Sequence, residues 1–152
     1  DRKKPIFAIR PGAKGDISLE SDQDGSEFVA WCQRRAGPYN PSTIVYGDIL
    51  YVLLDRGLVA GYEADSGKLV FGPERLVDRG GAFTSSPWAY NGKVFFLDEN
   101  GATYVLEAGR NYKLMRVNRL RKDEGICMAT PAIAGGNLLI RTDTRLYCIG
   151  KK

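Results

Sequence analysis

The sequence contains no histidine, and this absence excludes several kinds of site. Neither a Ser-His-Asp nor a Cys-His catalytic centre can be built from this chain alone, and a zinc site that needs histidine is excluded with them. The three cysteines, Cys32, Cys127 and Cys148, form no CxxC motif and no adjacent pair. Because their number is odd and their spacing wide, we expect three free thiols rather than a disulfide framework.

The chain also lacks a long hydrophobic run and a strong charge of either sign. No apolar stretch approaches the roughly 20 residues of a membrane-spanning helix, and the stretch from Ile6 to Ile9 is too short for the core of a secretion signal. The net charge of +4 comes from 22 basic and 18 acidic residues, so it permits an acidic partner but does not favour nucleic acid. The localisation is left open by these features.

What the chain does contain is a repeat of 44 residues, beginning at Ser42, Ser86 and Thr130. Each copy continues with a two-residue turn that suits a hairpin, then an apolar strand, a second turn and a third strand. The hairpin turns are Gly47-Asp48, Asn91-Gly92 and Gly135-Gly136. A repeat of this length, made of short strands and glycine turns, is typical of a β-propeller with one four-stranded blade per repeat.

We therefore predict an all-β fold, a partial β-propeller of about three and a half four-stranded antiparallel blades, with about 13 strands and essentially no helix. Residues 1–152 would form a single partial propeller domain, in which an inserted polar loop at 11–26 interrupts the first half blade. Two complete blades and a three-stranded last blade follow, and the four segments are 1–36, 37–80, 81–124 and 125–152. The expected strands are 5–10, 27–33, 42–46, 49–54, 58–63, 68–71, 84–90, 93–98, 102–107, 112–117, 128–134, 137–142 and 144–149.

The copies resemble the pyrroloquinoline-quinone-like (PQQ-like) propeller repeat, which runs from Ser-Pro through a Tyr-Val strand to Leu-Tyr-Ala-Leu-Asp, Thr-Gly-Lys and a Trp. The second copy matches best, through Gly57, Glu63, Ser66-Gly67-Lys68 and Phe71, whereas the third has Arg110-Asn111-Tyr112 in place of Thr-Gly-Lys. The resemblance implies that Phe71 packs between blades. It also implies the C-terminal portion of a bacterial propeller protein that is exported to the periplasm or the cell exterior.

Enzymes of that superfamily hold the quinone on the propeller axis, with a calcium-type ion, an acidic base and commonly a pair of adjacent cysteines. This sequence has no such pair and supplies about half a ring of blades, so it does not support PQQ, and we expect no cofactor. An acidic motif, Glu20, Asp22 and Asp24, resembles the start of an EF-hand calcium loop. Because Trp31 stands where that loop needs a bidentate Glu, calcium binding there is not expected.

Propellers usually bind partners on the face formed by the loops that lead into each innermost strand, here named the approach loops. We expect the aromatic members of this candidate face to be exposed, and its residues are Arg34, Arg35, Tyr39, Arg79, Phe83, Arg119, Arg121 and Lys122. Acidic residues in the turns of the same face offset much of the basic charge, namely Asp55, Asp98, Glu99 and Asp143. An ordinary rim of mixed charge is therefore the simpler interpretation.

These observations favour a non-enzymatic binding or scaffold module, the C-terminal part of a larger bacterial PQQ-like propeller protein. Two alternatives stay open: a quinoprotein-like or carboxylate-based enzyme domain completed by further blades, and an envelope-assembly adaptor that binds extended strands by edge addition. The expected partners are a protein or an acidic polymer, together with the missing propeller half or a second copy pairing at exposed strand edges. We expect Trp88 to pack against the neighbouring blade rather than to line the axial channel.

Overall fold

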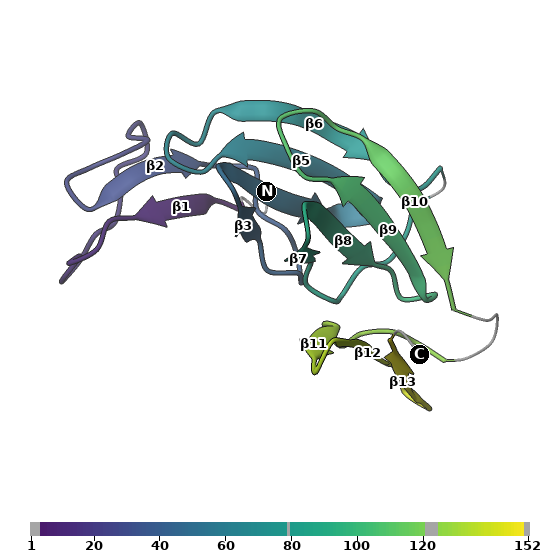
Figure 1. Cartoon of the computed structure of the whole chain (residues 1–152). Coiled ribbons are helices and arrows are strands. Elements are labelled where there is room, and N and C mark those ends of the chain that lie inside the picture. Colours follow the sequence, from purple (N-terminus) through teal and green to yellow (C-terminus); the bar gives the residue numbers. More distant parts are fainter. Residues whose placement is uncertain (1–3, 79, 121–124, 151–152) are drawn as a thin grey trace.

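The computed structural model describes residues 4–78, 80–120 and 125–150, and nearly all regular structure in these ranges is β-strand. In these described ranges, thirteen strands form four antiparallel sheets, each built from strands that are consecutive in the sequence. The first and the last sheet lie at opposite ends of the row of sheets (Figure 1). Within the described ranges the only helical element is a 3-10 turn, Asp55–Gly57, and no helix has the length and hydropathy of a membrane span.

The four sheets correspond to the blades of a partial propeller, and the predicted all-β class is confirmed. The first sheet holds β1 (Ile6–Ile9) and β2 (Val29–Gln33). The second holds β3 (Ile44–Tyr46), β4 (Ile49–Leu54), β5 (Leu58–Glu63) and β6 (Leu69–Arg75). The third holds β7 (Trp88–Tyr90), β8 (Lys93–Leu97), β9 (Ala102–Glu107) and β10 (Leu114–Arg119). The last holds β11 (Ala132–Ala134), β12 (Asn137–Arg141) and β13 (Leu146–Ile149).

The innermost strands β3, β7 and β11 are shorter than predicted, and residues before them form hydrogen bonds that link neighbouring sheets. The N–H of Ser42 donates to Oγ of Ser86, and the N–H of Ser86 donates to Oγ1 of Thr130, both at 2.9 Å. The outer strand β6 is longer than predicted, because it continues past a bulge until Arg75 pairs with Leu58.

The central strand β4 shows how the sheets are held together. Side chains alternate across a strand, so Ile49, Tyr51 and Leu53 face the third sheet while Leu50 and Val52 face the first. All five side chains are buried, at 6% exposure or less. Because β4 has a neighbouring sheet on each face, its sequence is a continuous apolar run rather than an alternating one.

Aromatic side chains join successive sheets. Trp31 of the first sheet donates its Nε1–H to the carbonyl of Ala64 at 3.0 Å, and its ring covers Gly67, where an added Cβ would lie 2.5 Å from the ring. Between the second and third sheets, the Phe71 ring lies 6.0 Å from that of Tyr51 and 6.3 Å from that of Tyr112, measured between centroids. Phe71 thus packs between blades, as the repeat implied.

The interface between the third and last sheets contains Trp88, which stacks on Phe95 with 5.2 Å between ring centroids. Trp88 is 8% exposed and belongs to a cluster with Leu97, Cys127 and Ile140, so the prediction that it packs against the neighbouring blade is confirmed. All three cysteines are free, as expected from their spacing, and only Cys148 is exposed.

Arg110, where the third copy departs from the repeat, forms an ionic contact between the second and third sheets. Its guanidinium contacts the carboxylate of Asp48 at 3.2 Å and that of Glu63 at 2.6 Å. Hydrogen bonds from Ser66 and Arg110 hold the pKa of Glu63 below its usual value. Where the repeat has a turn residue, this copy therefore has an arginine that forms ion pairs between blades.

Candidate functional site

The approach-loop face is built on a hydrogen-bond pattern that repeats from sheet to sheet. In the third sheet the N–H of Glu99 donates to the carbonyl of Ala82, and in the last sheet the N–H of Asp143 donates to the carbonyl of Ile126. Both members of the second pair lie 44 positions after those of the first. In these two sheets the turn between the second and third strands is thus tied to the loop that leads into the same sheet, which gives this part of the face a regular scaffold.

A pocket of about 190 Å³ opens on this face at the seam between the second and third sheets. Its lining combines three residues that the sequence placed on this face, Tyr39, Phe83 and Glu99, with two that it did not, Arg56 and Thr84. Thr84 Oγ1 donates to the carboxylate of Glu99 at 2.6 Å, which fixes the acidic wall. The site therefore brings together residues from two approach loops and two turns.

Phe83 is not an exposed aromatic, and that prediction is wrong. Its side chain is 9% exposed and its ring lies 5.9 Å from that of Tyr104, between centroids. The ring fits against Gly57 and Gly81, where an added Cβ would lie 2.8 and 2.9 Å from it. These glycines let a loop residue turn inward, so Phe83 forms the floor of the pocket and anchors the loop to the core.

Tyr39 is exposed as expected, with 64% of its surface accessible. The Nζ of Lys4 lies 4.7 Å from the centroid of its ring, a cation–π contact that orients the ring. Arg56, which also lines the pocket, has a left-handed backbone, φ 62° and ψ 25°, which is uncommon for a residue other than glycine. Its side chain is exposed.

Arg34 does not join this pocket, contrary to the grouping that the sequence suggested. Its guanidinium contacts the carboxylate of Asp24 at 3.1 Å and donates to the carbonyls of Glu20 and Gln23. The side chain therefore fastens the inserted loop to the first sheet. Arg35 and Arg119 are exposed but do not line the pocket. Arg79, Arg121 and Lys122 lie outside the described residues. Among the described residues, the pocket thus brings together the two predicted aromatics, Tyr39 and Phe83, and none of the predicted basic side chains.

A buried carboxylate supports the turn beside the pocket. Asp98 is 5% exposed, and it accepts hydrogen bonds from the N–H of Ala102 at 2.8 Å and from the hydroxyl of Tyr104 at 3.1 Å. Burial, followed by the nearby charge of Asp98, raises the pKa of Tyr104 to about 12. The phenol stays protonated at neutral pH, so this pair stabilises the turn through a donated hydrogen bond.

The acidic motif that resembles a calcium loop is arranged differently from an EF-hand. Asp24 is paired with Arg34, and the carbonyl of Glu20 accepts from the same guanidinium. In the described ranges no three carboxylate, cysteine or histidine side chains are grouped as metal ligands. The motif thus forms part of the fastening of the inserted loop.

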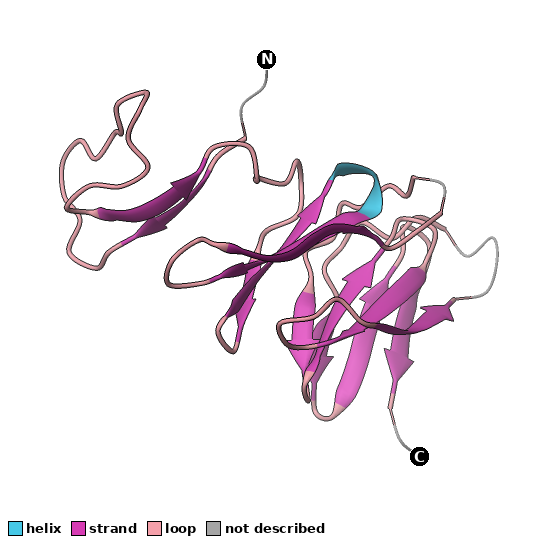
Figure 2. Cartoon of the chain, turned by 90° about the horizontal axis from the view of Figure 1, so that it is seen from above, coloured by secondary structure: helices cyan, strands magenta, loops and turns pink. Residues whose placement is uncertain are grey.

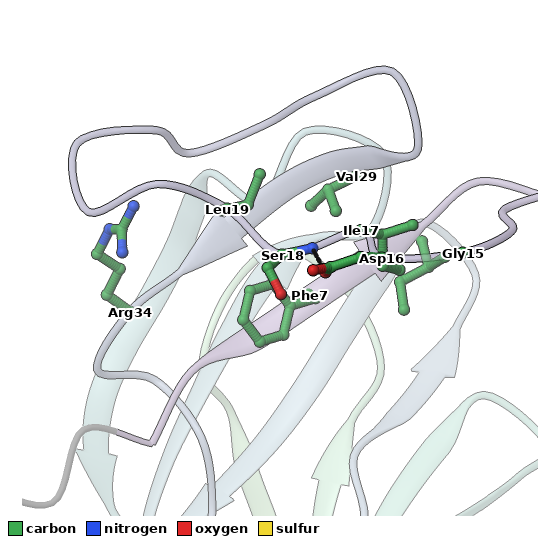
Figure 3. Close-up of a pocket in the computed structure, with 9 residues that line it drawn as sticks. Phe7, Gly15, Asp16, Ile17, Ser18, Leu19, Val29 and Arg34 are labelled. Carbon is green, nitrogen blue, oxygen red and sulfur yellow. Dashed lines mark hydrogen bonds between the residues drawn. The ribbon is translucent and has the colours of Figure 1, made fainter.

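A second, larger hollow lies between the β1–β2 hairpin and the inserted loop, at the end of the row shown in Figure 2. Its volume is about 500 Å³, and Figure 3 shows Arg34 at one end of it and Gly15 and Asp16 at the other. The walls between these ends are mainly apolar, with Phe7, Ile9, Ile17, Leu19 and Val29. Although the loop is mostly exposed, as expected, Ile17 and Leu19 are half-buried because they cover the outer face of the hairpin.

The solved structures similar to this chain share little sequence identity with it. BamB from Moraxella catarrhalis, a β-propeller, is 19% identical with a TM-score of 0.60, and the match covers 80% of this chain and 36% of BamB. The computationally designed Ika4 protein is 12% identical with a TM-score of 0.50, over 71% of this chain and 64% of that one. The chain thus spans about a third of the length of BamB.

A quinohemoprotein alcohol dehydrogenase, ADHIIG from Pseudomonas putida HK5, is 17% identical with a TM-score of 0.48, over 66% of this chain and 16% of that one. This likeness is too weak to bear on a quinone site. No protein-family model matches the chain, and no curated protein sequence matches it. The likeness to BamB confirms that the chain has the predicted fold of a partial β-propeller.

Proposed function

We propose that the chain is a non-enzymatic binding or scaffold module, the C-terminal part of a larger bacterial propeller of the PQQ-like type. The partial propeller fold supports this proposal, as does the match to about a third of BamB, which leaves room for further blades in a complete ring. We further propose a periplasmic or extracellular location, in keeping with the PQQ-like resemblance. The partner is a protein that docks on the approach-loop face.

The pocket at the seam between the second and third sheets is the observation that carries this proposal. Its volume of about 190 Å³ falls below the roughly 300–1,000 Å³ of small-molecule sites, so it suits one or two anchoring side chains rather than a cofactor. Exposed tyrosine and arginine are enriched at protein interfaces, and Tyr39 and Arg56 stand at the mouth. Together with Lys4 above the tyrosine ring, they favour a partner segment that carries an acidic side chain.

Site-specific photocrosslinking in the source cells tests the proposal directly. A photoreactive residue in place of Tyr39 should form an adduct with one protein, and the adduct should diminish when Arg56→Ala is added. The matched control is Tyr90, which is 60% exposed at the far end of β7, and a photoreactive residue there should give no such adduct. Equal adducts from both positions, or none from position 39, would refute a dedicated docking face.

Adding polyglutamate to the crosslinking experiment distinguishes a protein partner from an acidic polymer. Polyglutamate should reduce the adduct at position 39 only if the face recognises charge alone. The enzyme alternative is addressed by titrating the purified chain with PQQ and calcium in the presence of a redox dye. We expect no turnover above the free cofactor, and clear turnover would replace the binding function by a quinoprotein one.

A further inference from the structure

The outer face of the last sheet has the composition of an interface between blades, yet no described residue covers it. Leu146 is 69% exposed there, while the equivalent positions of the two preceding sheets, Val59 and Thr103, are 0% and 7% exposed. Ile126 and Met128 are 47% and 55% exposed on the same side and line a hollow of about 300 Å³. An exposed apolar face of this kind marks an interaction surface.

One residue of this face departs from an ordinary blade interface. Arg141 lines the same hollow, at the position that Leu53 and Leu97 occupy in the preceding sheets, and both leucines are 0% exposed. A guanidinium that becomes covered by a neighbouring sheet is costly unless a carboxylate meets it. Asp143 lines the same hollow, so the face presents apolar side chains together with one guanidinium and one carboxylate, and an occupant that brings apolar side chains and a carboxylate for Arg141 fits it.

The opposite end of the chain offers both features. On the outer face of the first sheet, Phe7 and Ile9 are 46% and 56% exposed, and they line the hollow of about 500 Å³ beneath the inserted loop. Residues 11–28 carry five carboxylates and a single lysine, and one of these carboxylates, Asp16, lies at the edge of the hollow. The hollow thus has an apolar floor with Asp16 towards one end and Arg34 at the other, and the floor and Asp16 complement the face that bears Leu146 and Arg141.

We propose that the 152-residue chain by itself associates head to tail, with the last sheet of one copy packed over the hollow between the β1–β2 hairpin and the inserted loop of the next. Leu146 and Met128 then pack beside Phe7 and Ile9, while Arg141 meets the carboxylate of Asp16. Such a joint is heterologous, so it either closes into a ring or continues into a longer assembly. The inference goes beyond docking at the approach-loop face, because it uses neither Tyr39 nor Arg56.

Light scattering of the purified 152-residue chain during size exclusion tests the joint. The average mass should rise with protein concentration and fall at high salt, because the joint includes exposed charges. Leu146→Asp should abolish the association. The matched control is Leu69→Asp, since Leu69 is 54% exposed on the outer strand β6 and should leave the association unchanged.

Reversing the charge of Arg141 and of Asp16 tests whether the last sheet and the hollow beneath the inserted loop are the two surfaces of the joint. Arg141→Glu alone and Asp16→Lys alone should each weaken self-association roughly tenfold, equivalent to about 1.4 kcal/mol. An equimolar mixture of the two variants should recover it, because each then supplies the charge that the other lacks. Circular dichroism confirms that every variant keeps its strands.

Three outcomes would overturn the proposal: a monomer at every concentration, association that survives Leu146→Asp, or a mixture that fails to recover. The first outcome would indicate that further blades of the same polypeptide cover these faces. None of the three would affect docking at Tyr39, which is measured separately by crosslinking.

Discussion

The backbone N–H of Ser86 donates to Oγ1 of Thr130 at 2.9 Å, across the seam between the third and last sheets. The same bond joins Ser42 to Ser86 across the preceding seam, and both pairs are separated by 44 positions. The sequence repeat is thus also a repeat of hydrogen bonds. In each one, the hydroxyl of a Ser or Thr that precedes an innermost strand accepts from the backbone N–H of the equivalent residue in the preceding sheet. A further blade would continue the series by accepting from the N–H of Thr130.

Removal of the Ser86 hydroxyl should weaken one seam only. Ser86→Ala deletes the acceptor of the Ser42 N–H, and we expect it to lower the free energy of unfolding by about 0.5–1 kcal/mol, as for a partly exposed hydrogen bond. Ser42→Ala is the matched control, since it keeps the donating N–H and alters an exposed side chain. Chemical denaturation measures the difference, and equal effects of both substitutions would contradict the role of the hydroxyl.

Phe83 and Tyr39 lie in the same pocket, but truncation of the two side chains should cost very different amounts of stability. Phe83→Ala removes a buried ring that packs on Tyr104, and a loss of about 3–5 kcal/mol in the free energy of unfolding is expected. Tyr39→Ala should change stability by less than about 0.5–1 kcal/mol, because its ring is exposed. Thermal denaturation compares the two, and a mild effect of Phe83→Ala would mean that the ring is not an anchor.

The three thiols should differ in reactivity. Cys148 is exposed, whereas Cys32 and Cys127 are buried and their pKa values are raised by burial, which disfavours the reactive thiolate. A thiol reagent added to the folded protein should therefore modify Cys148 rapidly and the other two only after unfolding. In Cys148→Ser the rapid phase should vanish. A mass lower than that of the reduced chain by the two hydrogens of a disulfide would contradict free thiols.

The buried phenol of Tyr104 should make stability fall at high pH. Because its pKa is raised from 10.0 to about 12 in the fold, the unfolded chain releases the proton first. The contribution of Tyr104 is therefore complete below about pH 10 and is lost as the pH rises towards about 12. Denaturation followed against pH should show a smaller decline for Tyr104→Phe than for the unaltered chain. The control Tyr90→Phe alters an exposed ring and should leave the decline unchanged.

The features that were predictable from the sequence are those that local chemistry determines. The Asn91-Gly92 turn adopts left-handed φ values of 49° and 70°, as a tight hairpin turn requires, and it fixes the pairing of β7 with β8. The run 49–54 was predicted as a strand with the bounds that β4 has, since a continuous apolar stretch between turn residues leaves little choice.

The candidate site was less predictable, because it depends on residues distant in the sequence. Phe83 turns inward only because Gly57, from the preceding sheet, leaves room for its ring. Arg34 was grouped with the approach loops by its position after a strand, yet carbonyls of the inserted loop capture its guanidinium. The pocket itself arises from the seam, and no single copy of the repeat contains that seam.

The two-sided burial of β4 has a consequence for how the chain opens. A sheet with partners on both faces loses two sets of contacts when it detaches, while a sheet at either end of the row loses one. Stability in such an array is close to a sum over nearest neighbours, so fluctuations begin at the ends and travel inward. Backbone amides should thus exchange their hydrogens most slowly in β4, β5, β8 and β9, and progressively faster towards β1 and β13. Local opening of the described sheets should therefore begin at the first and last sheets and reach the two central sheets last.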